Sequence, residues 1–322
     1  MKYVTLGKSE MRVSRLAFGT WQLGGDWGTT DTSAAVSAIR LAADNGVTFF
    51  DTAQAYGFGA SERLLGQALR GRIRNDLFIA TKGGLRKNGA RVTRDASPES
   101  IRLGVEESLR ALATDYIDLY QIHWPDPQTP FQETADALGK LVADGKVLHV
   151  GVSNFDVAQM ELFSETLSVE TLQPPYHLFH RDIEKEVLPY ARENNIGVLV
   201  YGPLAHGLLG GSLRLDTRFV PDDWRAQSLD FHGSTYQHNL SKVDELKDFA
   251  QRELGVTVSQ LATAWTLANP AVHVAIVGTR NPDHVREVLS AAELRLDQRT
   301  MSRIEEIARD VIPVVGPSPE SV

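Results

Sequence analysis

Cysteine is absent from this chain of 322 residues. The protein therefore forms no disulfide, binds no metal through a thiolate and uses no cysteine nucleophile. The N-terminus lacks the continuous apolar stretch of a signal peptide, and no segment has the length needed to span a membrane. We therefore expect a cytoplasmic protein without a membrane partner.

The chain also lacks an excess of positive charge, since its net charge is −8 and its pI about 5.6. Acidic and basic residues are interspersed, which argues against a nucleic-acid partner. Hydrophobic residues make up 42% and charged residues 23%, an ordinary composition for a globular protein with a large core. We expect one domain over residues 1–322, as a monomer or a weak homo-oligomer.

Several familiar motifs are missing or incomplete. No G-x-G-x-x-G follows the first strand-like run, and Gly7-Lys8-Ser9 lacks the earlier glycine of a P-loop. The sequence GVSNF resembles a nucleophile elbow, but Phe155 stands where its second glycine belongs. His177 and His180 are a pair without a third ligand, so no metal site is expected.

Short apolar runs typical of buried strands alternate with segments of helical periodicity. The strand-like runs are residues 15–20, 47–51, 77–81, 116–122, 147–153, 171–173, 197–202 and 272–278. Ser97-Pro98-Glu99 and the pair Thr257 and Gln260 are helix-start signals. Eight βα units without a linker-like change in composition predict a closed (β/α)8 TIM barrel.

The remaining segments frame this barrel. Residues 1–14 resemble a hairpin cap, with Gly7 and Lys8 between two extended runs. Periodicity fades over residues 203–239, so a long loop is expected after the seventh strand, with helices resuming near Ser241. Residues 313–322 contain three prolines and are expected to form a flexible tail.

Polar residues follow or end many of these strands. They are Asp51, Lys82, His123, Ser153, Gln173 and Tyr201. Because the carboxyl ends of barrel strands meet at one rim, we expect these side chains to gather there.

Three of these residues, Asp51, Lys82 and His123, suit one reaction together with Tyr56. A tyrosine ordinarily has a pKa of about 10, and an adjacent ammonium lowers that pKa. Lys82 is expected to be the ammonium, with Asp51 holding it, so that Tyr56 serves as general acid and His123 as a hydrogen-bonding partner of a substrate oxygen. This set suits protonation of an alkoxide as it forms from a carbonyl, but does not supply the two electrons.

Each residue also has an ordinary structural explanation. Asp51 could cap the following segment, Asp51 and Lys82 could form a structural ion pair, and His123 could pack beside Trp124. Their joint occurrence at strand ends favours catalysis.

The sequences FFDTAQAYGFGASERLLGQAL, IATKGG, DLYQIHWPD, VGVSNF and VLVYGPLAHGLLGG, in this order, resemble the aldo-keto reductase superfamily. The resemblance covers about residues 13–296 and is greatest to the bacterial branch that includes the inositol-operon and general-stress oxidoreductases. It implies an NADP(H)-dependent oxidoreductase that interconverts a carbonyl and an alcohol, with a small-molecule carbonyl or alcohol as its substrate.

The resemblance also implies roles for individual residues. It places the catalytic tetrad on Asp51, Tyr56, Lys82 and His123. Cofactor contacts fall on Gly19, Thr20, Trp21, Asp51, Ser153, Asn154, Gln173, Tyr201, Gly202, Leu204, Gly207, Gly278, Thr279, Arg280 and His284. Substrate contacts fall on Trp21, Tyr56, His123 and Trp124, and Trp27 and Trp224 are further aromatic candidates.

The 2′-phosphate of the cofactor is expected after the eighth strand. Gly278 and Thr279 offer backbone donors, Arg280 adds a bidentate cation, and Asn281-Pro282 start a helix whose N-terminus attracts anions. We count no acid there that could bind a free ribose diol, so NADP(H) is preferred over NAD(H). Unlike the relatives, the chain has His284 and Val288 where Gln and Asn are common, and Val277 and His206 where Pro and Arg are common.

Two alternatives remain open. The first is a cofactor-binding regulatory subunit with vestigial turnover, resembling the potassium-channel β subunits. The second is a barrel lyase that uses Lys82 as a Schiff base, which leaves Tyr56, Ser153 and Asn154 unexplained.

Overall fold

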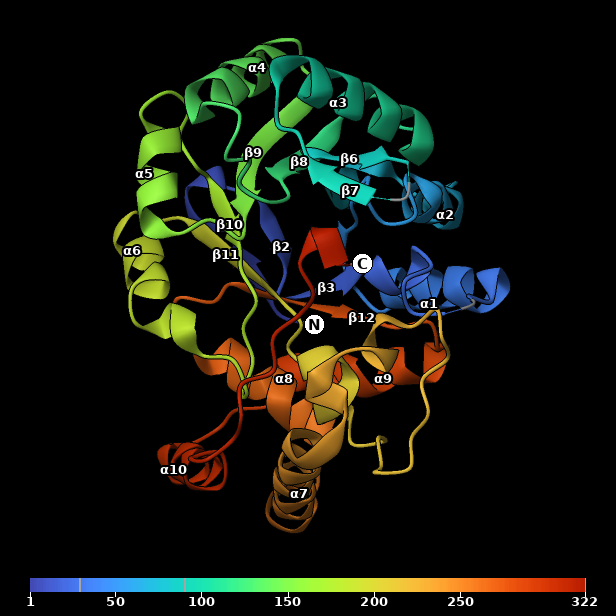
Figure 1. Cartoon of the computed structure of the whole chain (residues 1–322), viewed down its shortest axis with the longest axis vertical. Coiled ribbons are helices and arrows are strands. Elements are labelled where there is room, and N and C mark those ends of the chain that lie inside the picture. The colour runs from blue at the N-terminus through green and yellow to red at the C-terminus, as the bar shows by residue number, and fades with distance from the viewer. Residues whose placement is uncertain (29, 90, 322) are drawn as a thin grey trace.

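The computed structural model describes residues 1–28, 30–89 and 91–321. Eight parallel strands close into a barrel, in which the last strand pairs with the first (Figure 1). In barrel order they are β3 (Leu16–Gly19), β4 (Phe49–Asp51), β5 (Phe78–Gly83), β8 (Ile117–Ile122), β9 (Val147–Ser153), β10 (Thr171–Gln173), β11 (Gly197–Tyr201) and β12 (Val274–Gly278). The predicted (β/α)8 barrel is confirmed.

The α-helices lie outside the strands, as Figure 1 shows. They are α1 (Thr32–Asp44), α2 (Ala60–Leu69), α3 (Pro98–Leu112), α4 (Phe131–Ala143), α5 (Val157–Ser164), α6 (Val187–Glu193), α7 (Gly233–Phe249), α8 (Val258–Ala268), α9 (Pro282–Leu289) and α10 (Gln298–Ile307). The Ser97 side chain caps α3, and Thr257 and Gln260 form the predicted capping box of α8. Within the described ranges, no helix is both long and apolar enough to cross a bilayer.

Successive strand residues point alternately into and out of the barrel. Phe50 packs outward against the helices, whereas Phe49 and Ala80 belong to the cluster that fills the interior. The same cluster contains Ala17, Leu119, Leu199, Val274 and Ile276. Because the period is two, Asp51 and Lys82 share the inward direction of Phe49 and Ala80, but one step nearer the carboxyl rim.

A hairpin closes the other end of the barrel. Strands β1 (Tyr3–Thr5) and β2 (Arg12–Ser14) pair antiparallel, as predicted. Leu6, Met11 and Val13 are buried and join the interior cluster. The apolar plug at the amino-terminal end leaves the carboxyl rim for polar side chains.

Two elements differ from the prediction. An additional hairpin, β6 (Leu85–Asn88) and β7 (Arg91–Arg94), stands after β5, and Asn88-Gly89 was an overlooked turn signal. Helix α7 begins at Gly233, well before Ser241. Its apolar face is interrupted by Asn239, a fully buried residue that bonds the backbone N–H and C=O of Ile312 and so masked the helical pattern.

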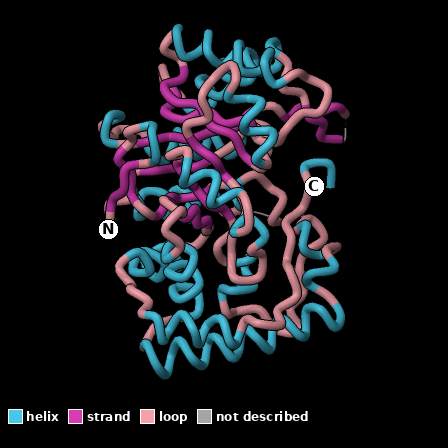
Figure 2. Tube along the Cα trace, turned by 90° about the vertical axis from the view of Figure 1, so that its left-hand side faces the viewer, coloured by secondary structure: helices cyan, strands magenta, loops and turns pink. Residues whose placement is uncertain are grey.

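The C-terminal tail lies against the barrel. Val314 is buried and donates its N–H to Phe179 O at 3.0 Å, and Glu320 pairs with Arg94 at 2.7 Å. Figure 1 shows the terminal turn in front of the barrel centre, and Figure 2 shows the chain end turned back toward the strands. The flexibility expected of residues 313–322 stays a prediction.

Gly66 lies where α2 contacts α3, and substituting it tests how closely these two helices pack. A Cβ at Gly66 would lie 2.4 Å from Leu112 O, so Gly66→Ala should lower the free energy of unfolding by about 1–3 kcal/mol. Gly139 on α4 has nothing within 4 Å of such a Cβ, so Gly139→Ala should raise it by about 0.5–1 kcal/mol. Urea unfolding measures both, and equal stabilisation by the two variants would contradict the packing.

Candidate active site

A cavity of about 880 Å³ opens at the carboxyl ends of the strands. Of the residues predicted for the site, Lys82 lies below the cavity floor and Trp224 is not among the lining residues, whereas the others, including Trp27, line the cavity. The lining members are Gly19, Thr20, Trp21, Asp51, Tyr56, His123, Trp124, Ser153, Asn154, Gln173, Tyr201, Gly202, Leu204, Gly207, Gly278, Thr279, Arg280 and His284. The fold therefore brings residues from distant parts of the sequence to one surface.

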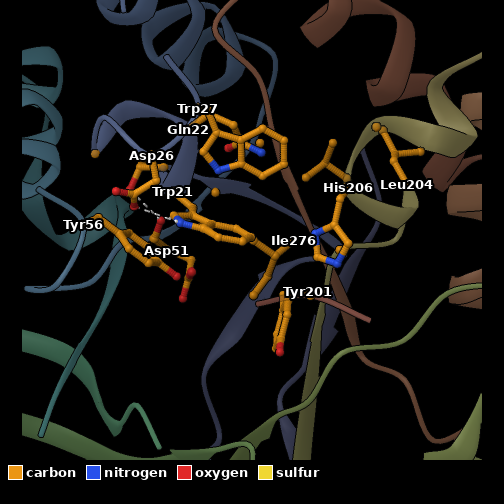
Figure 3. A pocket seen from close by; sticks show the side chains of 18 of the residues that line it. Trp21, Gln22, Asp26, Trp27, Asp51, Tyr56, Tyr201, Leu204, His206 and Ile276 are labelled. Carbon is orange, nitrogen blue, oxygen red and sulfur yellow. Dashed lines mark hydrogen bonds between the residues drawn. The ribbon is translucent and has the colours of Figure 1, made fainter. Parts of the chain in front are cut away.

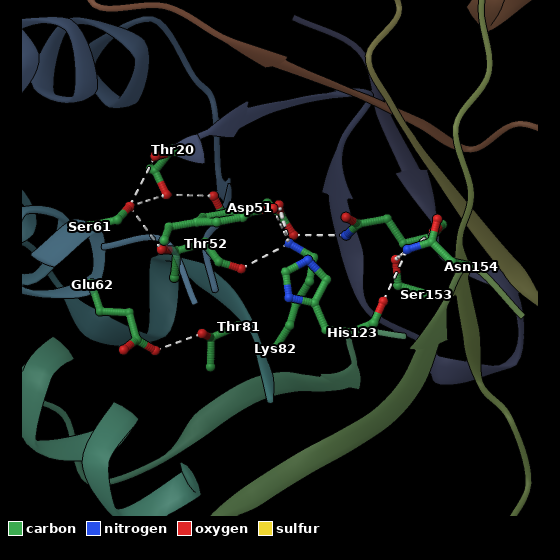
Figure 4. A network of polar contacts seen from close by, with 12 residues as sticks. Thr20, Asp51, Thr52, Ser61, Glu62, Thr81, Lys82, His123, Ser153 and Asn154 are labelled. Atoms are coloured by element: carbon green, nitrogen blue, oxygen red, sulfur yellow. Dashed lines mark hydrogen bonds and ion pairs between the residues drawn. The ribbon is translucent and has the colours of Figure 1, made fainter. Parts of the chain in front are cut away.

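A buried ion pair lies at the centre of the cavity floor (Figure 4). Lys82 Nζ lies 2.7 Å from Asp51 Oδ1, and the two side chains are 0% and 4% exposed. The ammonium also donates to Thr52 O at 2.9 Å and to the Tyr56 hydroxyl oxygen at 3.3 Å. Gln173 Nε2 donates to the second Asp51 oxygen at 2.8 Å. All three N–H groups of the ammonium therefore have acceptors, one of them the phenol.

Tyr56 lies on the turn after β4, between two rings. Trp21 stacks on it with centroids 6.3 Å apart, and His123 meets it edge-on at 5.6 Å. Burial raises the pKa of Tyr56 well above its usual value, and the charges of Asp51 and Asp26 raise it further. The lowered pKa predicted from the adjacent ammonium is wrong, because desolvation of the phenolate outweighs that attraction. Tyr56 therefore keeps its proton at neutral pH.

His123 is neutral in this environment. Burial, and then the charge of Lys82, lowers the pKa of its imidazole well below the usual value. Its carbonyl oxygen accepts a hydrogen bond from Asn154 Nδ2 at 3.0 Å, which fixes the backbone at the end of β8. The ring therefore offers a hydrogen bond to a bound oxygen and does not carry a charge.

A chain of amides and hydroxyls continues the floor away from Tyr56. Ser153 Oγ donates to Gln173 O at 2.8 Å, and Asn154 Nδ2 donates to Ser153 Oγ at 3.1 Å. Tyr201 closes the chain by donating to Asn154 Oδ1 at 2.9 Å. Asn154 has φ 62°, a left-handed conformation that asparagine tolerates better than most residues.

The far end of the cavity is suited to an anion. Asn281 caps α9 by accepting from Asp283 N at 2.9 Å, and Arg280 Nη1 reaches across to Trp27 O at 3.0 Å. Glu287 of α9 also lines this end and accepts a hydrogen bond from Ser259. The expectation that no acid stands here is therefore wrong, although the spacing from His284 to Glu287 already placed both on one helix face.

The chain was then compared with known proteins. Residues 15–309 match the aldo/keto reductase family. The chain is 39% identical over 320 residues to aldo-keto reductase YhdN of Bacillus subtilis, covering 98% of this chain and 97% of the relative. It is 33% identical over 324 residues to an NADH-specific methylglyoxal reductase of Escherichia coli, with 96% and 98% covered.

Solved structures of aldo-keto reductases are also similar to this chain. The glycerol dehydrogenase AKR11B4 of Gluconobacter oxydans has a TM-score of 0.86 at 40% identity, with 96% of each chain covered. An aldo-keto reductase of Klebsiella pneumoniae in complex with NADPH has a TM-score of 0.75 at 30% identity, with 99% and 98% covered.

The chain belongs to the aldo/keto reductase family. The resemblance drawn from its motifs is confirmed, as is the barrel that the resemblance implied. In this aldo/keto reductase, within the ranges described, no cluster of three or more His, Asp or Glu side chains is arranged to hold a metal ion.

The motifs missed several residues of the cavity in this aldo/keto reductase. Asp26 and Arg225 come from the loops after β3 and β11, and Gly316 and Pro317 come from the C-terminal tail. Both loops follow strand ends, and that position in the sequence could have predicted them as part of the site. No sequence feature predicted the tail, because its position depends on contacts with Phe179 and other distant residues.

The buried ion pair gives a stability prediction. Lys82→Met leaves Asp51 buried without its cation, so the free energy of unfolding should fall by about 3–5 kcal/mol, and the double variant Lys82→Met/Asp51→Leu should recover much of it. The pair Lys146–Glu106 is about a third exposed, so Lys146→Met should cost less than about 1 kcal/mol. Urea unfolding followed by tryptophan fluorescence compares them, and similar losses for the two single variants would refute the role of the pair.

Proposed function

We propose that the protein is an NADP(H)-dependent oxidoreductase that interconverts an aldehyde or ketone and its alcohol. The observation that carries the proposal is the 3.3 Å contact between Lys82 Nζ and the Tyr56 hydroxyl, in a cavity that continues to Arg280. A protonated phenol beside a buried ammonium is suited to donate a proton to an oxygen that becomes negative.

The cavity fits a dinucleotide. The ring of Tyr201, the amides of Asn154 and Gln173, and the anion site at Arg280 lie along one continuous surface. Tyr201 would stack on the nicotinamide, the amides would bind its carboxamide, and Arg280 would pair with the 2′-phosphate. When bound, the nicotinamide supplies or accepts the hydride. The Klebsiella relative binds NADPH, which supports the choice, whereas the Escherichia coli relative is NADH-specific.

The residues around Tyr56 divide the proton chemistry between them. Tyr56 donates its proton to the carbonyl oxygen, and Lys82 stabilises the phenolate that this leaves. Asp51 holds Lys82 charged and directed at the phenol through the 2.7 Å contact. His123, being neutral, orients the carbonyl by a hydrogen bond. In the oxidative direction Tyr56 receives the proton instead.

The alternatives fit the site less well. A Schiff base needs a deprotonated and accessible lysine, but Lys82 is fully buried and all its N–H groups have acceptors. Trapping with borohydride and a carbonyl substrate would reveal such a lyase. A regulatory subunit has no need of the complete tetrad, and would bind cofactor with little turnover.

Removing the phenol hydroxyl tests the proton donor. Tyr56→Phe should lower kcat for carbonyl reduction by about 10²–10⁴-fold, because the general acid is lost. Cofactor affinity should change little, since Tyr56 is not among its proposed contacts. Tyr3→Phe removes the hydroxyl of an exposed tyrosine on the cap hairpin and should behave as the parent does.

The assay follows NADPH oxidation with 4-nitrobenzaldehyde, and fluorescence titration gives cofactor affinity. A Tyr56→Phe variant as active as the parent would refute the proposed acid. Tight cofactor binding by a parent that turns over no carbonyl would favour the regulatory subunit instead.

A pair of arginines on the same segment tests the cofactor preference. Arg280→Ala should raise the Kd of NADPH by about 10–100-fold through loss of a charged hydrogen-bond donor, and should change that of NADH much less. Arg286→Ala, at an exposed position of α9, should affect neither. Fluorescence titration of the parent and both variants with NADPH and with NADH measures these affinities, and tighter binding of NADH by the parent would overturn the preference for NADP(H).

A further inference from the structure

An acid in the cavity has no part in the proton chemistry above. Asp26 follows Gly24 and Gly25 in the loop after β3 and lines the cavity that contains Tyr56. Its backbone is fixed, because Asp26 O accepts from Trp224 N at 3.1 Å. Figure 3 shows its carboxylate beside Trp21 and on the same side of the cavity as Tyr56.

The carboxylate of Asp26 is poorly satisfied by the protein. Trp21 Nε1 donates to Asp26 Oδ2 at 3.4 Å, which is long for a hydrogen bond. Within the described part of the chain, no lysine, arginine or histidine forms an ion pair with it. A carboxylate has two oxygens and accepts about four hydrogen bonds, so most of its capacity is unused.

Cations in or below the same cavity already have partners. Arg225 binds Asp223 through Nη2 at 2.6 Å and Nε at 2.9 Å, and its guanidinium lies 4.6 Å above the ring of Trp27. Lys82 is bound to Asp51 below the floor. Lys87 lines the same cavity from β6, with its ammonium 5.6 Å from the Phe58 ring. Asp26 therefore has acceptor capacity for a hydrogen-bond donor bound in the cavity, and the other cations of the cavity disfavour a cationic donor.

Aromatic rings connect Asp26 with Tyr56. Trp21 is stacked on Tyr56 and also on Trp224, the latter with centroids 6.1 Å apart and 14° between planes. Trp27 meets Trp21 edge-on at 5.1 Å. Asp26 contacts the indole N–H edge of Trp21, and its charge acts on Tyr56. A small molecule with its carbonyl at Tyr56 therefore shares the cavity with the rings of Trp21 and Trp27 and with the acceptor Asp26.

We propose that Asp26 determines specificity by accepting a hydrogen bond from a hydroxyl group close to the reacting carbonyl of the substrate. The preferred substrates are then α-hydroxy aldehydes, α-hydroxy ketones and the corresponding polyols. This inference rests on the proposed function, since it needs a carbonyl bound at Tyr56.

The physical basis is an asymmetry in hydrogen-bond energetics. A substrate with the hydroxyl gains a charge-assisted hydrogen bond, whereas one with a methyl group there desolvates Asp26 and leaves it unpaired. Sites built around such an acceptor reject the deoxy analogue strongly. A 2-keto acid is rejected more strongly, because it places a second negative charge beside Asp26.

Hydroxyacetone and butanone test the proposal, since they differ by a hydroxyl in place of a methyl group next to the carbonyl. With NADPH the parent should reduce hydroxyacetone with a kcat/KM at least about tenfold higher. In Asp26→Asn this ratio should fall by about tenfold, chiefly through the KM for hydroxyacetone. In the same variant the kcat/KM for pyruvate, relative to that for butanone, should rise.

The control is Asp248→Asn, at an exposed carboxylate of α7 outside the cavity, which should leave the ratio as in the parent. If Asp26→Asn does not fold, as judged by circular dichroism, Asp26→Ser serves the same comparison. A parent without the preference, or a folded variant that keeps it, overturns the role of Asp26.

Failure of the proposed function gives a different result. If the parent oxidises NADPH with none of these ketones nor with 4-nitrobenzaldehyde, the reductase is wrong. Calorimetric binding of hydroxyacetone and butanone to the parent and to Asp26→Asn then decides the present proposal. Tighter binding of hydroxyacetone than of butanone by the parent, but not by Asp26→Asn, supports the role of Asp26. Equal binding of the two ketones by the parent overturns it.

Discussion

The contact between Lys82 and Asp51 is the interaction on which the site depends. Two opposite charges are buried together at the end of the barrel interior, and either one alone would be costly there. The pair is satisfied because Thr52 O, Gln173 Nε2 and the Tyr56 hydroxyl complete its hydrogen bonds. Burial lowers the pKa of Lys82 while Asp51 opposes that shift, and the ion pair holds the ammonium directed at the phenol that we propose as proton donor.

The barrel supplies the geometry for that pair. Strand periodicity directs Phe49 and Ala80 into the apolar interior and places Asp51 and Lys82 one step higher on the same face. The cap hairpin fills the opposite end with Leu6 and its neighbours. The buried charges therefore lie above an apolar layer, and burial dominates the pKa of Tyr56.

The residues proposed to determine specificity lie in a different part of the molecule. The aromatic walls and Asp26 come from the loops after β3 and β11, and Arg94 holds the tail at Glu320. These segments pack on one another and not on the barrel interior. Their residues can vary without disturbing the ion pair, so one reaction can serve substrates of different polarity.

The sequence alone determined the strand and helix alternation, the cap and the position of Asp51 and Lys82 at strand ends, because these follow from local periodicity. It also placed Ser153, Gln173 and Arg280 at strand ends, where the structure brings them to one cavity. Only the tertiary structure decided the raised pKa of Tyr56, the start of α7 and the presence of Asp26 and the tail in the cavity. Desolvation and contacts between distant loops produce these features, and neither is encoded in the spacing of neighbouring residues.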